Sequence, residues 1–362
     1  MADTVSDILV IGGGIAGISA AAALSDLGSV TVLEREGALA MHASGRSAAL
    51  FEATYGRPAT VALNRASRDW HATAHDGFLS DRGMMVVAGP DDAGAFDRDV
   101  AAMSLNRVSA AEARDLFDIL DTDACDRFAH HAGAWDIDTD REIQCLAREL
   151  RGNGGTILTG CEVVAIDRDG GWQVTTDSRR HSARILVNAA GAWADGIAVM
   201  AGVSPLGLVP FRRSMGRIPA PGGHDVARWP MVFGAGETWY CKPDAGALIV
   251  SPADEDAVEP HDAWADDMVL AEGLARYEAC VTEPVTRLLT SWAGLRTFAP
   301  DRHLVLGRDF GDPDFVWCAG QGGYGFQTAP AAARLIADLV AGRSPLLDAD
   351  IVAALDPARF ST

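Results

Sequence analysis

Three glycines near the N-terminus have the spacing of a phosphate-binding turn. Gly12, Gly14 and Gly17 form G-x-G-x-x-G directly after the apolar run DILVI. In this motif the first glycine makes a tight turn, the second lets the main chain approach a pyrophosphate, and the third lets a helix pack close to the strand. The helix that follows, expected to run to about Leu27, would offer its unpaired N–H groups to the phosphates.

A carboxylate follows where the ribose of a bound nucleotide would lie. The segment VTVLERE is expected to form a second strand that ends in Glu34. An acidic residue at the end of this strand accepts hydrogen bonds from the ribose hydroxyls. Strand, helix, second strand and carboxylate together predict a dinucleotide site.

The segment MHASGRSAAL favours FAD over NAD as that dinucleotide, because the glycine motif alone serves both. Ser44, Arg46 and Ser47 supply hydroxyls, backbone donors and a fixed positive charge directly after the second strand. A domain that binds only NAD would continue here into another helix and strand. A second donor-rich loop suits the longer body of FAD.

A second glycine cluster lies near the C-terminus, in CAGQGGYGFQTAP. Glycine at such density indicates positive φ angles or a backbone that lies close against something. We expect DFVWCAG to form a strand, QGGYGFQ a turn and TAPAAARLIADLVAG a helix. Thr328 is the expected N-cap of that helix, with Pro330 in its first turn.

These motifs resemble the D-amino-acid oxidase superfamily of FAD-dependent amine oxidoreductases, and within it the bacterial D-arginine dehydrogenases most. The resemblance covers nearly the whole chain, and its motifs occur in the family's order. They are VIGGGIAG, LERE, SGRSAA with TYG, VNAAGAWAD, PLGLVPFRRS, YCKPDAG, SWAGLRTF and AGQGGYGFQT. The resemblance implies that the second glycine cluster runs beside the isoalloxazine ring, so both clusters would approach one cofactor.

The implied fold class is α/β, a discontinuous Rossmann-like FAD-binding domain with a second α+β domain for the substrate. The second domain would be built on a mixed, mainly antiparallel sheet. Alternating apolar runs in 155–195, with a turn at DGG, predict strands of the first domain. The expected boundaries are 1–80, 136–200 and 293–362 for the FAD-binding domain, and 81–135 and 201–292 for the substrate domain.

The FAD is expected to be bound without a covalent bond. His42 stands where some members of the superfamily attach FAD through histidine, but the resembling dehydrogenases have an unbonded histidine here. AGLRTF has no nearby cysteine, through which sarcosine-oxidase types link FAD. The residues expected at the cofactor are Gly12, Gly14, Ile15, Ala16, Gly17, Glu34, Arg35, Ser44, Arg46, Ser47, Ala48, Val164, Ala190, Gly191, Gly322, Gly323, Tyr324, Gly325 and Gln327.

Two arginines are the expected substrate ligands, Arg213 in FRRSMGR and Arg296 in WAGLRTF. A guanidinium binds the planar carboxylate of an α-amino acid through two parallel hydrogen bonds. The resemblance adds Tyr55 and Tyr240 as residues that line the substrate pocket, although either could be a half-buried core tyrosine. The other expected pocket residues are Met84, Leu50, Glu52, Met231, Phe233 and Gly323, of which Met231 and Phe233 could equally be core.

The implied reaction is oxidative deamination, in which hydride passes from Cα of the substrate to flavin N5. The amine must be neutral, and water then hydrolyses the imine to a 2-oxo acid and ammonia. No strong side-chain base is required, which suits a sequence without a Ser-His-Asp or Cys-His arrangement. Alternatives are oxidation of a secondary amine, such as an N-methyl amino acid or proline, oxidation of a 2-hydroxy acid, and a non-catalytic flavin-binding role.

The substrate's side chain is predicted to be neutral or apolar. Met84 stands where the arginine-oxidising relatives carry a glutamate, and Leu50 stands where they carry a histidine. A cationic head buried without a partner loses several kcal/mol of solvation. Glu52, in the loop before Tyr55, could reach the same end of the pocket with a substitute carboxylate, but a glutamate in a loop is more often solvated, and this point is left open. The D configuration comes from the resemblance alone, and the electron acceptor, oxygen or a quinone, stays open.

Composition argues against a nucleic-acid partner, a zinc site and a secreted or membrane-spanning chain. The formal net charge of −20 argues against nucleic acid, because a negative field repels polyanions. Six cysteines lack the spacing of a zinc site. The acidic start MADTVSD is unlike a signal peptide, and no apolar run is long enough to span a membrane, so a cytoplasmic location is expected. The oligomeric state is open.

Overall fold

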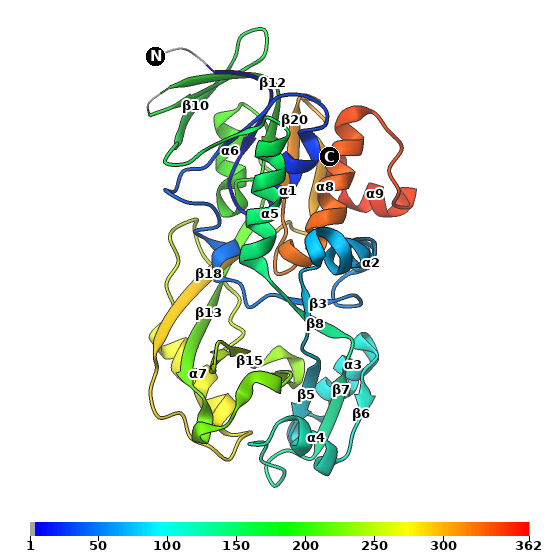
Figure 1. Cartoon of the computed structure of the whole chain (residues 1–362), viewed down its shortest axis with the longest axis vertical. Coiled ribbons are helices and arrows are strands. Elements are labelled where there is room, and N and C mark those ends of the chain that lie inside the picture. The colour runs from blue at the N-terminus through cyan, green and yellow to red at the C-terminus, as the bar shows by residue number, and fades with distance from the viewer. Residues whose placement is uncertain (1–3, 178, 362) are drawn as a thin grey trace.

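Two large sheets organise the chain in the computed structural model, which describes residues 4–177 and 179–361 (Figure 1). The first, an eight-stranded sheet, contains the N-terminal strand and follows the order β10-β11-β12-β1-β2-β9, with β20 beside β12 and β19 beside β20. Its strands are β1 (Thr4–Ile11), β2 (Val30–Leu33), β9 (Thr156–Leu158), β10 (Val163–Arg168), β11 (Trp172–Thr176), β12 (Arg180–Asn188), β19 (Val305–Arg308) and β20 (Phe315–Ala319).

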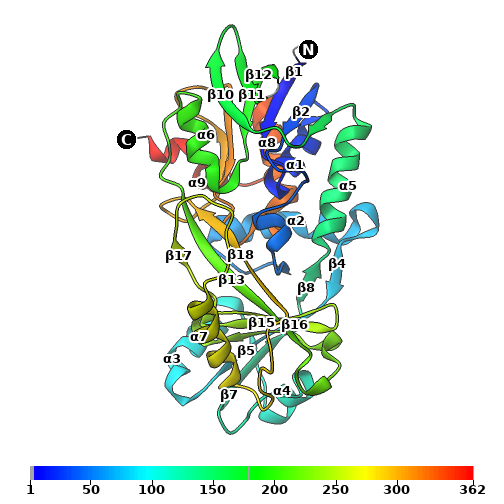
Figure 2. The same cartoon turned by 90° about the vertical axis from the view of Figure 1, so that its left-hand side faces the viewer.

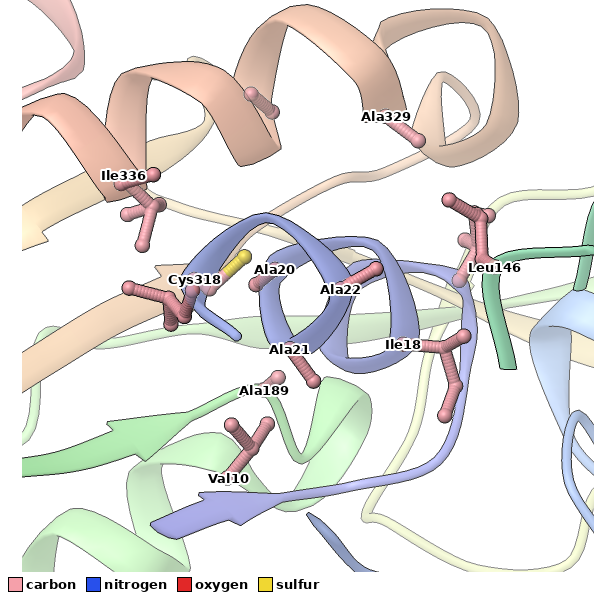
Figure 3. Packing of buried hydrophobic residues seen from close by; sticks show 14 of the residues in the cluster. Val10, Ile18, Ala20, Ala21, Ala22, Leu146, Ala189, Cys318, Ala329 and Ile336 are labelled. Atoms are coloured by element: carbon pink, nitrogen blue, oxygen red, sulfur yellow. The ribbon is translucent and has the colours of Figure 1, made fainter. Parts of the chain in front are cut away.

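Helices cover this sheet because β1 is apolar on both faces. Leu9 and Val10 are both fully buried between the parallel neighbours β12 and β2. Figure 3 shows helix α1 between helix α8 and the side chains of Val10 and Ala189. The helices of this half are α1 (Ile15–Leu24), α2 (Pro58–Thr73), α5 (Thr139–Gly152), α6 (Ala194–Met200), α8 (Gly325–Ala341) and α9 (Ala349–Leu355).

The second large sheet has nine strands in the order β17-β13-β16-β15-β14-β5-β7-β6, with β18 also beside β13. Every pairing except β14 with β5 is antiparallel, so the sheet is mixed and mainly antiparallel, as predicted. Its strands are β5 (Met84–Ala88), β6 (Asn106–Arg107), β7 (Arg127–His131), β13 (Val209–Pro219), β14 (Met231–Gly234), β15 (Tyr240–Asp244), β16 (Ala247–Ser251), β17 (Asp256–Ala257) and β18 (Thr290–Phe298).

Smaller elements complete the second half and connect it to the first. A three-stranded sheet of β3 (Leu50–Glu52), β8 (Ala134–Ile137) and β4 (Leu79–Asp81) lies between the two large sheets in Figure 1. Helices α3 (Ala93–Met103), α4 (Ala110–Leu116) and α7 (Asp267–Glu278) belong to the second half. Figures 1 and 2 both show β13 and β18 side by side, running from the nine-stranded sheet toward the first half.

The predicted domain boundaries remain a proposal. Strands of the eight-stranded sheet fall within 1–80, 136–200 and 293–362. Those of the nine-stranded sheet fall within 81–135 and 201–292, except β18, which crosses residue 292. The acidic N-terminal stretch begins in residues 1–3, which lie outside the described part of the chain. Within 4–177 and 179–361, no helix is both long and apolar enough to traverse a bilayer.

Two predicted helix ends were wrong. Helix α1 ends at Leu24 rather than Leu27, because the Ser25 hydroxyl donates to the Ala22 carbonyl at 2.6 Å and closes the last turn. Helix α8 begins at Gly325, so Thr328 is not its N-cap. The Thr328 hydroxyl instead donates to the Tyr324 carbonyl at 2.8 Å, from inside the first turn. The start of α8 therefore lies among the glycines of the second cluster.

A histidine of α2 and a glutamate of α5 are buried close to each other. His71 and Glu142 are both fully buried, with 3.8 Å between Nδ1 and Oε2. Burial lowers the pKa of His71 to about 4 and raises the pKa of Glu142 to about 9. Both side chains are therefore neutral in the folded chain near pH 7.

The Glu142 carboxyl makes stability depend on pH. In the unfolded chain a glutamate has a pKa of about 4.3, so between about pH 6.5 and 9 only the folded chain holds this proton. The contribution of Glu142 to the free energy of unfolding then falls as pH rises, by up to about 1.4 kcal/mol per pH unit. Below about pH 6.5, protonation of His71 in the unfolded chain opposes this slope.

We predict that Glu142→Gln, which keeps the shape and removes the titration, flattens the decline in stability above pH 6.5. Urea unfolding at pH 6.5 and pH 8.5, with saturating FAD, measures it. The control is Glu149→Gln on the same helix, where the side chain is 42% exposed. Equal slopes in the wild type and in Glu142→Gln would contradict a neutral, buried Glu142.

Candidate active site

Three adjoining cavities lie at the carboxyl ends of the parallel strands and continue between the two large sheets. The dinucleotide cavity, about 330 Å³, is lined by Gly12, Glu34 and the segment 189–193. The middle cavity, about 150 Å³, shares Ser44 and Arg46 with it. The inner pocket, about 80 Å³, shares Arg213, Arg296 and Gly323 with the middle cavity. An extended ligand could thus lie through the first two and reach the third.

The first glycine cluster brings main chain against main chain at the edge of the dinucleotide cavity. Gly12 has φ +111°, and a Cβ there would meet the Ala189 carbonyl oxygen at 2.4 Å. A Cβ on Gly17 would meet the Gly12 carbonyl oxygen at 1.9 Å. A side chain at Gly12 would push the turn away from Ala189, and one at Gly17 would push α1 away from the turn, so this close packing requires glycine.

Glu34 is held in a fixed orientation at this cavity. Its Oε2 accepts a hydrogen bond from the Gly13 N–H at 2.5 Å, and its Oε1 accepts one from the Glu36 N–H at 2.8 Å. The side chain lines the cavity and is 9% exposed as a residue. The remaining lone pairs of the carboxylate can accept hydrogen bonds from a ligand.

The loop after the second strand is clamped to the rest of the protein. Ser44 Oγ accepts a hydrogen bond from the Ile15 N–H at 3.0 Å, one of the unpaired donors at the start of α1. The Arg46 guanidinium donates to the carbonyls of Ala263 and Ala293 at 2.8 and 3.0 Å, and pairs with Asp262 at 2.5 Å. Arg46 therefore lines the cavity, but its N–H donors already bind groups of the protein.

The only lysine in the chain holds the far end of this loop. Lys242 is 9% exposed, and its Nζ donates to the carbonyls of Ala48 and Ala49 at 2.9 and 2.8 Å. The same Nζ pairs with Asp136 Oδ1 at 2.8 Å. Because Arg46 and Lys242 fix both ends, the segment between them is a rigid wall of the middle cavity.

The second glycine cluster forms the opposite wall of the middle cavity. Gly322 has φ +52°, and a Cβ there would meet the Phe298 ring at 2.1 Å. A Cβ on Gly323 would lie 3.1 Å from an Arg296 nitrogen. Gly325 and Gln327, in the first turn of α8, also line this cavity, so the unpaired N–H groups and the partial positive charge of the helix start face it.

Strand register brings the two predicted arginines to one face. Arg213 of β13 lies opposite Gly294, and Arg296 of β18 lies opposite Phe211, so the arginines are diagonal neighbours. The Arg213 Nε donates to the Asp254 carbonyl at 2.8 Å, and its guanidinium lies 3.7 Å from a Glu255 carboxylate oxygen. Arg213 is therefore partly satisfied by the protein.

Arg296 is different, because it donates no hydrogen bond to any residue that the structure describes. Burial alone would lower the pKa of Arg296, but the nearby Tyr240, Tyr55 and Glu237 groups more than offset this, so its pKa is raised. The guanidinium stays charged in a pocket that offers it no anion at hydrogen-bonding distance. A bound carboxylate would supply one.

The two predicted tyrosines have different surroundings. Tyr240 is 2% exposed, and its hydroxyl has no hydrogen-bond partner within the described chain. Tyr55 donates its hydroxyl to Glu237 Oε1 at 2.6 Å. Burial, and then the Glu237 carboxylate, raise the pKa of Tyr55 well above its ordinary value, so its hydroxyl keeps the proton. Tyr240 is thus the hydroxyl left for a ligand.

Two carboxylates in the inner pocket were missed by the sequence analysis. Asp99 and Glu237 line the pocket together with Glu52. A signal for Asp99 was available, since Phe96, Asp99 and Met103 share one face of α3 and Phe96 is fully buried. A carboxylate on the buried face of a helix is uncommon. Glu237 has φ +54° in a glycine-rich turn, which no local pattern predicts.

All ten residues predicted for catalysis and the substrate pocket line the inner pocket. Most residues predicted for the cofactor line the dinucleotide or middle cavity. Four lie elsewhere: Gly17 packs beneath the turn, Ala48 lines the inner pocket, Tyr324 packs against Tyr55 with ring centroids 5.5 Å apart, and Val164 is 52% exposed. Side chains alternate along β10, so Val163 lines the cavity in place of Val164.

Comparison with known proteins gives relatives along the whole chain. The family "DAO: FAD dependent oxidoreductase" matches residues 7–339. The "tRNA 5-methylaminomethyl-2-thiouridine biosynthesis bifunctional protein MnmC" of Methylibium petroleiphilum is 26% identical over 401 residues, which cover 98% of this chain and 60% of that protein. The chain thus spans about three fifths of the length of this curated relative.

Solved structures share the fold. Glycine oxidase from Geobacillus kaustophilus superposes with a TM-score of 0.83 at 20% identity, over 98% of this chain and 99% of that one. L-proline dehydrogenase from P. horikoshii also gives 0.83, at 22% identity over 99% of each chain. Neither is a D-arginine dehydrogenase, so the finer likeness drawn from the motifs stays a prediction.

Proposed function

The chain belongs to the family of FAD-dependent oxidoreductases, and from that membership we propose that it oxidises the amine of a D-amino acid to a 2-oxo acid and ammonia. The observation that carries the proposal is that, within the described chain, neither the Arg296 guanidinium nor the nearby Tyr240 hydroxyl makes a hydrogen bond, in a pocket that adjoins the middle cavity. A cation and a hydroxyl donor together bind a carboxylate.

The residues present fit FAD as the cofactor. The glycine turn at Gly12, the Glu34 carboxylate and the first N–H groups of α1 suit its nucleotide half. The space beside Gly322 and Gly323 suits a flat ring, because side chains at these positions would collide with Phe298 or Arg296. When bound, FAD accepts the hydride of the oxidised substrate, and the first turn of α8 stabilises negative charge at that end.

The protein's own part in the reaction is to bind and orient the substrate. Arg296 and Tyr240 would hold the carboxylate, with Arg213 as a second positive charge whose position Asp254 and Glu255 fix. The same positive charges lower the pKa of a substrate amine nearby and so favour its neutral form. The apolar walls at Met84 and Met231 exclude water from the reacting carbon.

The substrate class is tested by anaerobic mixing with pairs of D- and L-amino acids. Loss of the flavin's visible absorbance should follow D-amino acids. Bleaching by N-methyl amino acids or proline would indicate a secondary-amine oxidase. Bleaching by 2-hydroxy acids would indicate an enzyme that oxidises 2-hydroxy acids. A flavin that none of these reduces would exclude the proposed reaction. The rate of re-oxidation in oxygen then separates an oxidase from a dehydrogenase that needs a quinone-type acceptor.

We do not propose tRNA as the substrate of this chain, although the name of the MnmC relative refers to tRNA. The formal net charge is −20, and a negative surface disfavours a polyanionic substrate. The inner pocket of about 80 Å³ is also lined by three carboxylates, which would repel phosphate groups. A free amino acid is the better match to this charge distribution.

We predict non-covalent attachment of FAD. His42 lines the dinucleotide cavity and not the middle cavity, and its Nε2 lies 2.8 Å from Glu36 Oε1. It is thus placed away from the proposed ring site. Acid precipitation should leave intact FAD in the supernatant and colourless protein in the pellet. A yellow pellet would show a covalent bond.

Arg296 and Arg213 should both contribute to substrate binding. A charge-assisted hydrogen bond contributes roughly 1.5–3 kcal/mol, so Arg296→Met should lower kcat/KM by about 10- to 150-fold with FAD still bound. Arg213→Met should lie in the same range. The control is Arg217→Met, also on β13, whose guanidinium pairs with Asp244 and lines none of the three cavities. Unchanged kinetics would remove the substituted arginine from the site.

A further inference from the structure

The inner pocket contains more negative charge than an amino-acid carboxylate requires. Its lining includes two guanidiniums, Arg213 and Arg296, and three carboxylates, Glu52, Asp99 and Glu237. A site that binds only a neutral-side-chain amino acid needs positive charge for the carboxylate and gains nothing from additional acids in its lining. Those of the five charged groups that lack a hydrogen bond or salt bridge within the protein therefore indicate what else the pocket can bind.

Two of the five charged groups are already satisfied by the protein. Arg213 donates to the Asp254 carbonyl and lies 3.7 Å from Glu255. Glu52 accepts hydrogen bonds from the Thr54 N–H and hydroxyl at 2.9 and 3.0 Å, and lies 3.8 Å from His131. Glu52 is thus turned into its own loop, so we do not assign it the role of a substitute carboxylate.

Asp99 and Glu237 form no salt bridge with any residue that the structure describes. Asp99 Oδ2 accepts only the Gly236 N–H, at 2.7 Å, which places it beside Glu237. Glu237 accepts only the Tyr55 hydroxyl, through Oε1. Burial raises the pKa of Asp99 and the charge of Glu237 adds to this, whereas the Gly236 hydrogen bond and the charge of Arg98 oppose it. The two carboxylates form a negative subsite in which neither makes a salt bridge within the described chain.

The subsite is separated from the reacting end of the pocket. Arg213, Arg296, Gly323 and Gln327 line both the inner pocket and the middle cavity, and within the described chain no Asp or Glu lines the middle cavity. The two arginines therefore lie where the inner pocket meets the middle cavity, whereas Asp99 and Glu237 do not line the middle cavity. Between the two ends the wall is apolar, formed by Leu50, Met84, Val86, Met103, Met231 and Phe233.

We propose that the substrate's side chain ends in a cation that binds between Asp99 and Glu237. The inference rests on the proposed amino-acid oxidation, because it assigns the carboxylate to Arg296 and the aliphatic stem to the apolar wall. A neutral substrate would desolvate two carboxylates without pairing them, whereas an ammonium or guanidinium pairs with both. A linear basic amino acid replaces the neutral substrate predicted from Met84.

Matched substrates that differ only in charge test this inference. D-Lysine should be oxidised with a kcat/KM about tenfold or more above that of D-norleucine, and D-arginine similarly above D-citrulline, because a pocket that buries charge discriminates strongly against an unpaired partner. If L-amino acids prove to be the substrates, the same pairs in the L series apply. Equal or better oxidation of the neutral member of each pair would overturn the inference.

Variants identify the residues. Glu237→Gln and Asp99→Asn should each reduce the preference for the cationic member by about tenfold, mainly through KM. The control is Asp97→Asn, on the same helix α3, whose carboxylate is 61% exposed and pairs with Arg107. A preference that survives both pocket variants, or that Glu52→Gln removes instead, would overturn the assignment to Asp99 and Glu237.

Ligand binding separates this inference from the proposed reaction. 5-Aminopentanoate and pentanoate carry the carboxylate without an α-amine, so their binding is measured by perturbation of the flavin spectrum without turnover. 5-Aminopentanoate should bind about tenfold more tightly, and Glu237→Gln should abolish the difference. If no amino acid reduces the flavin but this difference is observed, the reaction is wrong and the cation subsite is supported. Equal binding of the two acids would count against the subsite.

Discussion

The antiparallel ladder between β13 and β18 is the constraint on which the site depends. It runs from Val209–Phe298 to Arg217–Thr290, and it carries both arginines on one face. Leu295 of β18 also lines the dinucleotide cavity, and Arg296 lines both other cavities. A shift of one residue in this register would put the two arginines on opposite faces of the sheet, because side chains alternate along a strand. The ladder thus couples cofactor position to substrate position.

The parts of the site that were predictable from sequence are those that backbone chemistry dictates locally. Gly12 and Gly17 permit close backbone contacts that any Cβ would prevent, so the glycine motif in the sequence directly indicates these contacts in the structure. Glu34 was predictable because it comes directly after β2, the strand that follows that turn and its helix. Arg213 and Arg296 required the family resemblance, since their proximity arises from strands that begin some eighty residues apart in the chain.

The parts that were not predictable depend on packing between distant segments. Asp99 and Glu237 meet because the Gly236 N–H donates to Asp99, a contact between α3 and the turn after β14. Thr328 looked like an N-cap, but the glycine at 325 lets the helix begin earlier, against Ile15. Val164 and Val163 differ only in which side of β10 they occupy. Local propensity contains none of this information.

The separation of charge within the site resolves a conflict in amine oxidation. A carboxylate near the reacting nitrogen would raise the pKa of the ammonium and hold it in the unreactive form, whereas a nearby guanidinium lowers that pKa. Here the charged side chains that line both the inner pocket and the middle cavity are those of Arg213 and Arg296, whereas Asp99 and Glu237 line the inner pocket alone. One pocket can therefore attract a substrate of net positive charge through Asp99 and Glu237 and still favour loss of a proton from the α-amine. If one carboxylate were moved from Asp99 or Glu237 to position 323, where the inner pocket meets the middle cavity, it would raise the pKa of the α-amine. The total charge of the pocket would stay the same, but the reactive neutral amine would no longer be favoured.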